Sequence, residues 1–224
     1  DGIADRSASA PVCRVIFAGR AVLRHLWLVM LAVCASIHAD DWPQWRGSNR
    51  NAVSPETGLI RSWSDGPPVV NWRAAGIGEG YSSVVVAHGL VFTTGRIDGD
   101  VYCFAFDLET GKRQWASKVG TTTRNVMATP TVGDEFVYAV DPDGELICLQ
   151  RSNGQIVWQR NFTEDFGGRL MSGRGYGESP LIDGDRLICT PGGADAMIVA
   201  LDRRTGDVIW KSRIPDIGEK GSDG

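Results

Sequence analysis

Two short stretches of the sequence carry residue types that bind cations or phosphate groups in other proteins. In DPDGEL, Asp141 and Asp143 supply carboxylate oxygens at alternate positions ahead of Gly144, which is how a calcium-binding loop begins. A complete loop also needs later ligands, including a bidentate glutamate, and none is in register. The stretch FGGRLMSGRGYGESP, from Phe166 to Pro180, is glycine-rich but lacks the Gly-Lys-Ser/Thr ending of a phosphate loop. We therefore interpret the first stretch as a hairpin turn and the second as a long connection.

The histidines and cysteines are too scattered to form a ligand set. The three histidines are His25, His38 and His88, and the last of them lies in the turn-like VAHGL. The chain contains neither an adjacent cysteine pair nor a Cys-x-x-Cys-His haem motif. Cys103, Cys148 and Cys189 lie inside apolar strand patterns, where we expect them to be buried as small hydrophobic residues. The sequence therefore predicts no metal site and no disulfide framework.

A nine-residue phrase recurs three times and organises the rest of the chain. It reads DLETGKRQW at 107–115, QRSNGQIVW at 150–158 and DRRTGDVIW at 202–210. When the earlier Trp72 is included, the tryptophans are 43, 43 and 52 residues apart. A period of about 40 to 50 residues is typical of β-propellers and other repeat arrays.

The residues that persist in this phrase have structural roles. In the first copy, the Asp107 side chain can accept from backbone N–H groups, and Gly111 supplies the positive φ that closes the turn. Asn153 and Gly154 have this role in the middle copy, where Gln150 replaces the aspartate and predicts a weaker cap. Tryptophan adds a large apolar surface and an N–H that needs a partner, which suits a seam between repeats. The charged residues differ among the copies, so the phrase indicates how repeats join rather than a site of chemistry.

Each repeat also contains a hairpin pattern ahead of this phrase. These patterns are SVVVAHGLVF from Ser83, TPTVGDEFVY from Thr129 and SPLIDGDRLI from Ser179. Another apolar run then precedes the turn, so each repeat predicts four short strands. The 28 glycines and 8 tryptophans agree with short strands joined by tight turns. The predicted fold class is all-β, a β-propeller of four-stranded antiparallel blades.

The repeats resemble a known family. AFDLETGKRQW and ALDRRTGDVIW match the Ala-x-Asp-x-x-x-Gly-x-x-x-Trp docking motif of the pyrroloquinoline-quinone (PQQ)-like repeat, the quinoprotein alcohol dehydrogenase-like propeller. The resemblance covers residues 69–215 and implies that each tryptophan docks on the adjacent blade near its alanine and glycine. The implied blade-docking residues are Ala105, Gly111, Trp115, Gly154, Trp158, Ala200, Gly206 and Trp210. The segment 41–59, DWPQWRGSNRNAVSPETGL, also resembles the N-terminal signature of exported bacterial propellers in this family.

The pattern predicts three parts of the chain. These are an upstream extension and signal peptide at 1–39, an irregular segment at 40–68 and a partial propeller at 69–224. Full blades are expected at 81–120, 129–162 and 179–215, and VVNWRA around Trp72 resembles the last strand of another blade. The family implies seven or eight blades, so we expect the propeller to be incomplete in this chain. A gene fragment is favoured over a ring completed by self-association.

The N-terminal region has the features of a secretory signal. A basic stretch is followed by an uncharged apolar run from Leu26 to Ile37 and then by Ala39. The run is shorter than the roughly 20 residues that a transmembrane helix needs. We expect cleavage after Ala39 and export to the periplasm or cell envelope, with no transmembrane span after cleavage. Lipid anchoring through Cys34 is the minor alternative, because Val33 is bulky where lipoprotein signals have a small residue.

The connections ahead of the blades do not repeat, and we expect any ligand or partner to bind there. GIGEGYSS at 76–83 and the glycine-rich connection at 166–180 would lie near the mouth of a central channel. The ligand-face candidates on these and comparable connections are Glu79, Tyr81, Arg124, Arg174, Tyr176 and Glu178. The alternative interpretation is that they are solvated loop residues.

The resemblance implies an exported, non-catalytic propeller that acts as a binding or scaffold module, similar to a lipoprotein of outer-membrane barrel assembly. Its partners would be envelope proteins or peptides, or a small-molecule ligand. The alternative is a PQQ-dependent dehydrogenase that oxidises alcohols or sugars, and only that alternative implies PQQ and Ca²⁺ as cofactors. The net charge of −4, which becomes −6 without residues 1–39, offers no basic surface for nucleic acid.

Overall fold

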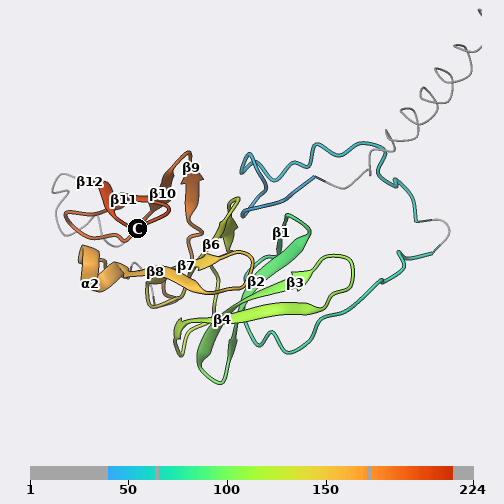
Figure 1. The fold of residues 1–224 in the computed structure, drawn as a ribbon, viewed down its shortest axis with the longest axis horizontal. Coiled ribbons are helices and arrows are strands. Elements are labelled where there is room, and N and C mark those ends of the chain that lie inside the picture. The colour runs from blue at the N-terminus through green and yellow to red at the C-terminus, as the bar shows by residue number, and fades with distance from the viewer. Residues whose placement is uncertain (1–39, 64–65, 171–172, 214–224) are drawn as a thin grey trace, which may run out of the picture. The chain divides into compact units, whose positions relative to one another are not determined.

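The computed structural model describes residues 40–63, 66–170 and 173–213 and contains three four-stranded antiparallel sheets (Figure 1). Blade 1 consists of β1 (Val85–Ala87), β2 (Leu90–Ile97), β3 (Asp100–Asp107) and β4 (Arg113–Thr121). Blade 2 consists of β5 (Thr131–Val132), β6 (Phe136–Val140), β7 (Glu145–Gln150) and β8 (Ile156–Asn161). Blade 3 consists of β9 (Leu181–Asp183), β10 (Arg186–Cys189), β11 (Ile198–Asp202) and β12 (Val208–Ser212).

Strands that follow one another in the chain are neighbours in each sheet. The predicted four strands per repeat and the all-β propeller fold are therefore confirmed, and the one short helix described, α2 (Phe162–Phe166), follows β8. The expected signal peptide and the Cys34 lipidation alternative lie outside the described residues. No helix in the described part of the chain is long and apolar enough to cross a membrane.

The turn between the third and fourth strand of each blade is closed by the residues that recur. In blade 1, Asp107 Oδ1 accepts from the backbone N–H of Thr110 at 2.8 Å, and Gly111 has a φ of 69°. In blade 3, Asp202 Oδ1 accepts from the N–H of Thr205 at 3.0 Å, and Gly206 has a φ of 74°. An aspartate cap and a glycine in the left-handed region hold the hairpin without strain.

Blade 2 closes the same turn with different side chains. Gly154, with a φ of 72°, donates its N–H to the carbonyl of Gln150 at 2.8 Å. Asn153 Oδ1 accepts from the N–H of Gln155 at 2.9 Å, on the far side of the turn from the aspartates of the other blades. The backbone geometry is thus retained although the cap has moved.

A β-bulge lies beside the tryptophan in every fourth strand. Ala105 pairs with Trp115, Cys148 with Trp158, and Ala200 with Trp210, and the register shifts immediately after each pair. A bulge adds one unpaired residue and increases the local twist of the strand. The repeated sequence therefore produces the same distortion at the same place in all three blades.

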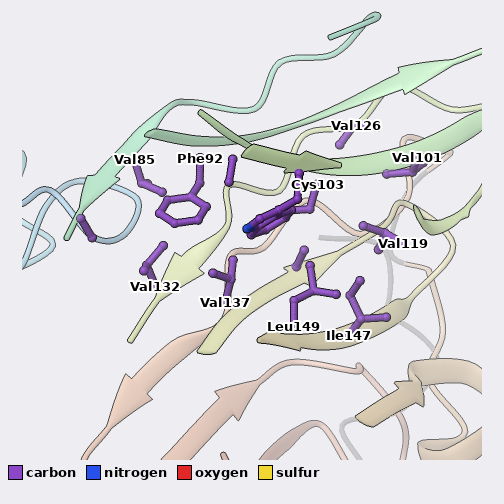
Figure 2. Packing of buried hydrophobic residues seen from close by; sticks show 14 residues of the cluster. Val85, Phe92, Val101, Cys103, Val119, Val126, Val132, Val137, Ile147 and Leu149 are labelled. Carbon is purple, nitrogen blue, oxygen red and sulfur yellow. The ribbon is translucent and has the colours of Figure 1, made fainter. Parts of the chain in front are cut away.

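The hydrophobic core lies between neighbouring blades rather than inside one sheet. Along β3, Val101, Cys103 and Ala105 belong to a cluster with blade 2, whereas Phe104 and Phe106 pack on the other face, against segment 72–77. Figure 2 shows side chains of both blades, among them Phe92, Cys103, Val137 and Leu149, gathered in the first cluster. Since adjacent residues of a strand point to opposite faces, β3 is buried on both faces and is almost continuously apolar.

Blades 2 and 3 share a second core, which α2 extends. Leu146 and Cys148 of β7 pack with Leu187 and Leu201 of blade 3. Helix α2 begins at an N-cap, Asn161, whose side chain accepts from two backbone N–H groups, and it buries its two phenylalanines in the same cluster. Cys103, Cys148 and Cys189 are buried and free, as predicted.

The segment that precedes the blades contacts all three of them. Trp42 forms an antiparallel bridge with Val86 of blade 1, and the Pro43 carbonyl accepts from the N–H of Val132 of blade 2 at 2.8 Å. Arg50 then reaches the start of blade 3, where its Nη2 donates to the carbonyl of Pro180 at 2.9 Å. An irregular segment thus holds the first strands of consecutive blades together.

Candidate functional site

The repeated tryptophan forms the seam between blades. The Trp115 ring of blade 1 lies against Gly154 of blade 2 so closely that a Cβ there would be 2.7 Å from ring atom Cδ2. Its indole Nε1 donates to the carbonyl of Arg151 at 2.9 Å. The buried indole N–H therefore has its partner in the turn of the next blade.

The same contact occurs twice more. Trp158 lies on Gly206 and donates to the Arg203 carbonyl at 3.1 Å. Trp72 lies on Gly111 and donates to the Leu108 carbonyl at 2.8 Å, so it occupies the position of a fourth-strand tryptophan ahead of blade 1. Trp210, on β12, is 39% exposed. Trp115 and Trp158 thus join neighbouring blades, and Trp72 joins the segment ahead of blade 1 to that blade.

Two of the six predicted ligand-face residues lie on the connection ahead of blade 1. Glu79 forms a backbone bridge with Arg96 and a 2.8 Å ion pair with its guanidinium. Tyr81 donates its backbone N–H to the Val126 carbonyl, while its side chain is 74% exposed. Tyr81 is therefore free to contact a partner, whereas Glu79 is already paired.

Arg124 and Arg174 lie on the connections that flank blade 2. Arg124 pairs with Asp143 through its Nη1 and donates from its Nε to the Gly173 carbonyl at 3.3 Å. It therefore ties the glycine-rich connection to the turn between β6 and β7. Arg174 is exposed on that connection.

Tyr176 differs from the expectation that it faces a ligand. It is buried, its ring packs edge-on against Phe162 at a centroid distance of 5.1 Å, and its hydroxyl donates to the Pro191 carbonyl at 3.0 Å. A tyrosine is buried in this way when its hydroxyl finds a partner inside the protein. Tyr176 therefore anchors the glycine-rich connection to blade 3.

Glu178 alone among the six candidates lines the larger of the two pockets described. This pocket has a volume of about 520 Å³ and lies where the start of blade 3 meets blade 2 and the N-terminal segment. Its apolar lining includes Met127, Val140, Phe162, Leu181 and Ile188. Its polar lining includes Arg50, Glu178, Ser179 and Thr190, and its volume is in the range of small-ligand sites.

Trp45 and Arg50 of the N-terminal segment complete the pocket and were not among the predicted site residues. Arg50 is half-buried; its Nε donates to Gln44 Oε1 at 3.2 Å and its Nη2 to the Ser179 carbonyl at 3.0 Å. Burial lowers the pKa of Arg50, and the charge of Glu178 opposes that shift. In the sequence, these two pocket residues are indicated only by their types, a tryptophan and an arginine in a segment with no strand pattern.

A second pocket, of about 410 Å³, lies at the stretch that resembles the start of a calcium loop. Asp141 Oδ1 accepts from the N–H groups of Asp143 at 2.9 Å and Glu145 at 2.8 Å, which makes the stretch a hairpin turn. Burial raises the pKa of Asp141 to about 6. Lys118 lines the same pocket, and Asp143 is paired with Arg124.

The described residues do not supply a cation donor set. No group of three or more His, Cys, Asp or Glu side chains in that part of the chain is placed to hold a metal ion. His88, with a φ of 53°, lies in the turn between β1 and β2, where its Nε2 is 4.0 Å from Asp134. The larger pocket of the described residues is lined by apolar side chains together with two charged ones, Arg50 and Glu178.

The three blades and their tryptophan seams define a PQQ-like repeat β-propeller. The profile of the family described as "Outer membrane protein assembly factor BamB" matches residues 98–218, and the chain belongs to this family.

Individual relatives support this assignment. BamB from Shewanella oneidensis is 23% identical over 177 residues, which are 76% of this chain and 43% of that protein. BamB from Kangiella koreensis is 29% identical over 142 residues, which are 59% of this chain and 32% of that protein. The chain therefore spans less than half the length of these relatives.

Solved structures with a similar arrangement include a BamB and a dehydrogenase. BamB from Moraxella catarrhalis is 24% identical, with a TM-score of 0.40 over 56% of this chain and 34% of its own. Quinohemoprotein alcohol dehydrogenase from Comamonas testosteroni is 23% identical, with a TM-score of 0.46 over 60% of this chain and 21% of its own.

Proposed function

We propose that the chain is an exported, non-catalytic propeller that binds proteins or peptides of the cell envelope and acts as a scaffold. The match to the outer membrane protein assembly factor family over residues 98–218 carries this proposal. The seam geometry supports it, because the repeated residues are used to join blades and leave the unrepeated connections to contact partners. One propeller architecture hosts many functions, so the connections must be tested directly.

Export is part of the same proposal. The basic stretch, the apolar run and Ala39 would direct the chain across the membrane, with cleavage after residue 39. The proposed location is the periplasm or cell envelope. Nucleic acid is not a proposed partner, because the chain has a net negative charge.

A quinone-dependent dehydrogenase would need a Ca²⁺ site beside the quinone. The turn at 141–146 does not suit Ca²⁺, because Asp141 Oδ1 already accepts from two backbone N–H groups and Asp143 is paired with Arg124. We therefore derive no chemical step through PQQ or Ca²⁺ for this chain.

Site-specific photo-crosslinking of the full chain in a Gram-negative host tests the scaffold proposal. A photoreactive amino acid at Tyr81 is placed on an exposed connection, and one at Glu109 is placed on the exposed turn between β3 and β4. We expect Tyr81 to crosslink to outer-membrane or assembly proteins and Glu109 not to. Equal crosslinking at both positions, or a chain found only in the cytosol, would contradict the proposal.

A dye-reduction assay tests the catalytic alternative in parallel. The same chain is incubated with PQQ, CaCl₂ and an electron-accepting dye, with ethanol or glucose as substrate. We expect no dye reduction above a control without protein. Turnover that disappears on addition of EDTA would overturn the non-catalytic proposal.

A further inference from the structure

Two opposite charges face the 520 Å³ pocket without bonding each other. Among the described residues, Glu178 makes no hydrogen bond or ion pair, although its charge acts on Arg50 and raises the pKa of that guanidinium against the lowering by burial. Arg50 donates from Nε and Nη2, but its Nη1 makes no hydrogen bond to any described residue. The pocket therefore offers one free carboxylate and one free guanidinium nitrogen.

The position of the free nitrogen is fixed by the other two. Gln44 Oε1 holds Nε at 3.2 Å, and the carbonyls of Ser179 and Pro180 hold Nη2 at 3.0 and 2.9 Å. A guanidinium is planar, so these contacts determine where the two Nη1 hydrogens point. A donor that is already oriented loses little freedom when it binds a carboxylate.

The rest of the pocket is suited to an apolar group. Met127, Phe162, Leu181 and Ile188 line its wall, and the ring of Trp45, which is 47% exposed, completes it. Removing apolar surface from water is favourable, so these side chains favour a ligand that carries an apolar group.

We propose that this pocket binds a small zwitterion with an apolar side chain, either a free apolar α-amino acid or a short peptide. The ligand carboxylate accepts from Arg50 Nη1, the ligand ammonium donates to Glu178, and the side chain packs against Trp45. Hydrogen bonds between ionised groups are about twice as strong as neutral ones, so both ends contribute to recognition. The proposal does not rest on the scaffold function, and either can hold without the other.

Isothermal titration of the full chain tests the proposal with four probes. L-leucine carries both charges, N-acetyl-leucine lacks the cation, leucinamide lacks the anion, and leucyl-leucine carries the charges farther apart. We expect leucine or leucyl-leucine to bind at least about tenfold more tightly than either blocked form, because each blocked form loses one charge-assisted bond. If leucine binds more tightly than leucyl-leucine, the ligand is a free amino acid, and if leucyl-leucine binds more tightly, it is a short peptide.

Glu178→Gln is the main variant, because Glu178 is exposed and the substitution keeps the size of its side chain. We expect it to weaken the zwitterion about tenfold and to leave N-acetyl-leucine unchanged. Arg50→Lys should have the opposite selectivity, weakening the zwitterion and N-acetyl-leucine but not leucinamide. Glu109→Gln removes a matched exposed carboxylate from the turn between β3 and β4, outside the pocket, and should have no effect.

Two results would overturn the proposal. One is that none of the four probes binds, or that all bind equally. The other is that Glu178→Gln binds the zwitterion as tightly as the parent chain and the control variant Glu109→Gln do. A circular dichroism spectrum and a thermal melt of each variant establish that it is folded before its affinity is compared.

Discussion

Trp115 of blade 1 lies against Gly154 of blade 2 and donates its indole hydrogen to the Arg151 carbonyl of the same turn. The contact joins a fourth strand to the turn that closes the next blade. The glycine adopts the positive φ that closes the turn, and its lack of a Cβ leaves room for the tryptophan ring. The glycine and the tryptophan that persist in the repeat therefore act together to join neighbouring blades.

We predict that Gly154→Ala destabilises the chain by about 2–4 kcal/mol, because the new Cβ would strain a turn with a φ of 72° and also overlap Ser117 Oγ and the Trp115 ring. Gly184→Ala is the matched control, since Gly184 has a φ of 58° but no atom within 4 Å of the added Cβ. It should cost only about 1–2 kcal/mol. Urea unfolding measures both, and equal costs would mean that the ring contact is not tight.

Trp115→Phe should lower the free energy of unfolding by about 1–3 kcal/mol, because it leaves the Arg151 carbonyl without its donor and removes buried area. Trp63→Phe is the control, since Trp63 is 59% exposed. Thermal melts of both variants provide the comparison. A melting temperature of Trp115→Phe as high as that of Trp63→Phe would contradict the seam interpretation.

The buried Asp141 should make stability depend on pH. Burial raises its pKa from 3.8 to about 6 in the folded chain, so the protonated form is the one that folding favours. Its contribution is fully present below pH 3.8 and is lost as the pH rises through about 6.

Asp141→Asn removes this charge while the amide oxygen keeps accepting from the two backbone N–H groups. We therefore expect the difference in free energy of unfolding, variant minus parent, to increase by about 1–2 kcal/mol when the pH is raised from 4 to 7.5. Asp134→Asn, at an exposed loop carboxylate, is the control. Urea unfolding at both pH values measures the gain, and a difference that does not change with pH would refute the prediction.

The buried cysteines should resist alkylation until the chain unfolds. Burial raises the pKa of Cys148 to about 12 and also raises the pKa values of Cys103 and Cys189, so little thiolate is present at neutral pH. Mass spectrometry after iodoacetamide treatment should find these three residues unmodified in the native chain and modified in urea. Rapid native labelling at any of them would mean that its blade opens readily.

Much of the fold could be predicted because it depends on short-range chemistry. The Asp107 cap, the Gly111 turn and the tryptophan four residues later lie within nine residues of one another, and their recurrence reveals the period of the blades. The apolar strand patterns around Cys103, Cys148 and Cys189 similarly predicted that these cysteines are buried. Such features persist because each strand and turn satisfies its own hydrogen bonds locally.

The candidate site was harder to predict because its residues are distant in the chain. Tyr176 and Glu178 are two positions apart in one glycine-rich connection, yet Tyr176 is buried against Phe162 and Glu178 lines the pocket. Composition does not distinguish them, because the direction of a loop side chain depends on what packs beside it.

The repeated turns and tryptophans in the amino-acid sequence thus establish the four-stranded blades, their order and the residues that join them. Tertiary packing alone brings Arg50 to the carbonyl of Pro180, 130 residues later, and places its free nitrogen and Glu178 on one pocket. The physical reason is that a turn is stabilised by neighbours in the chain, whereas a pocket exists only once separate segments have packed together.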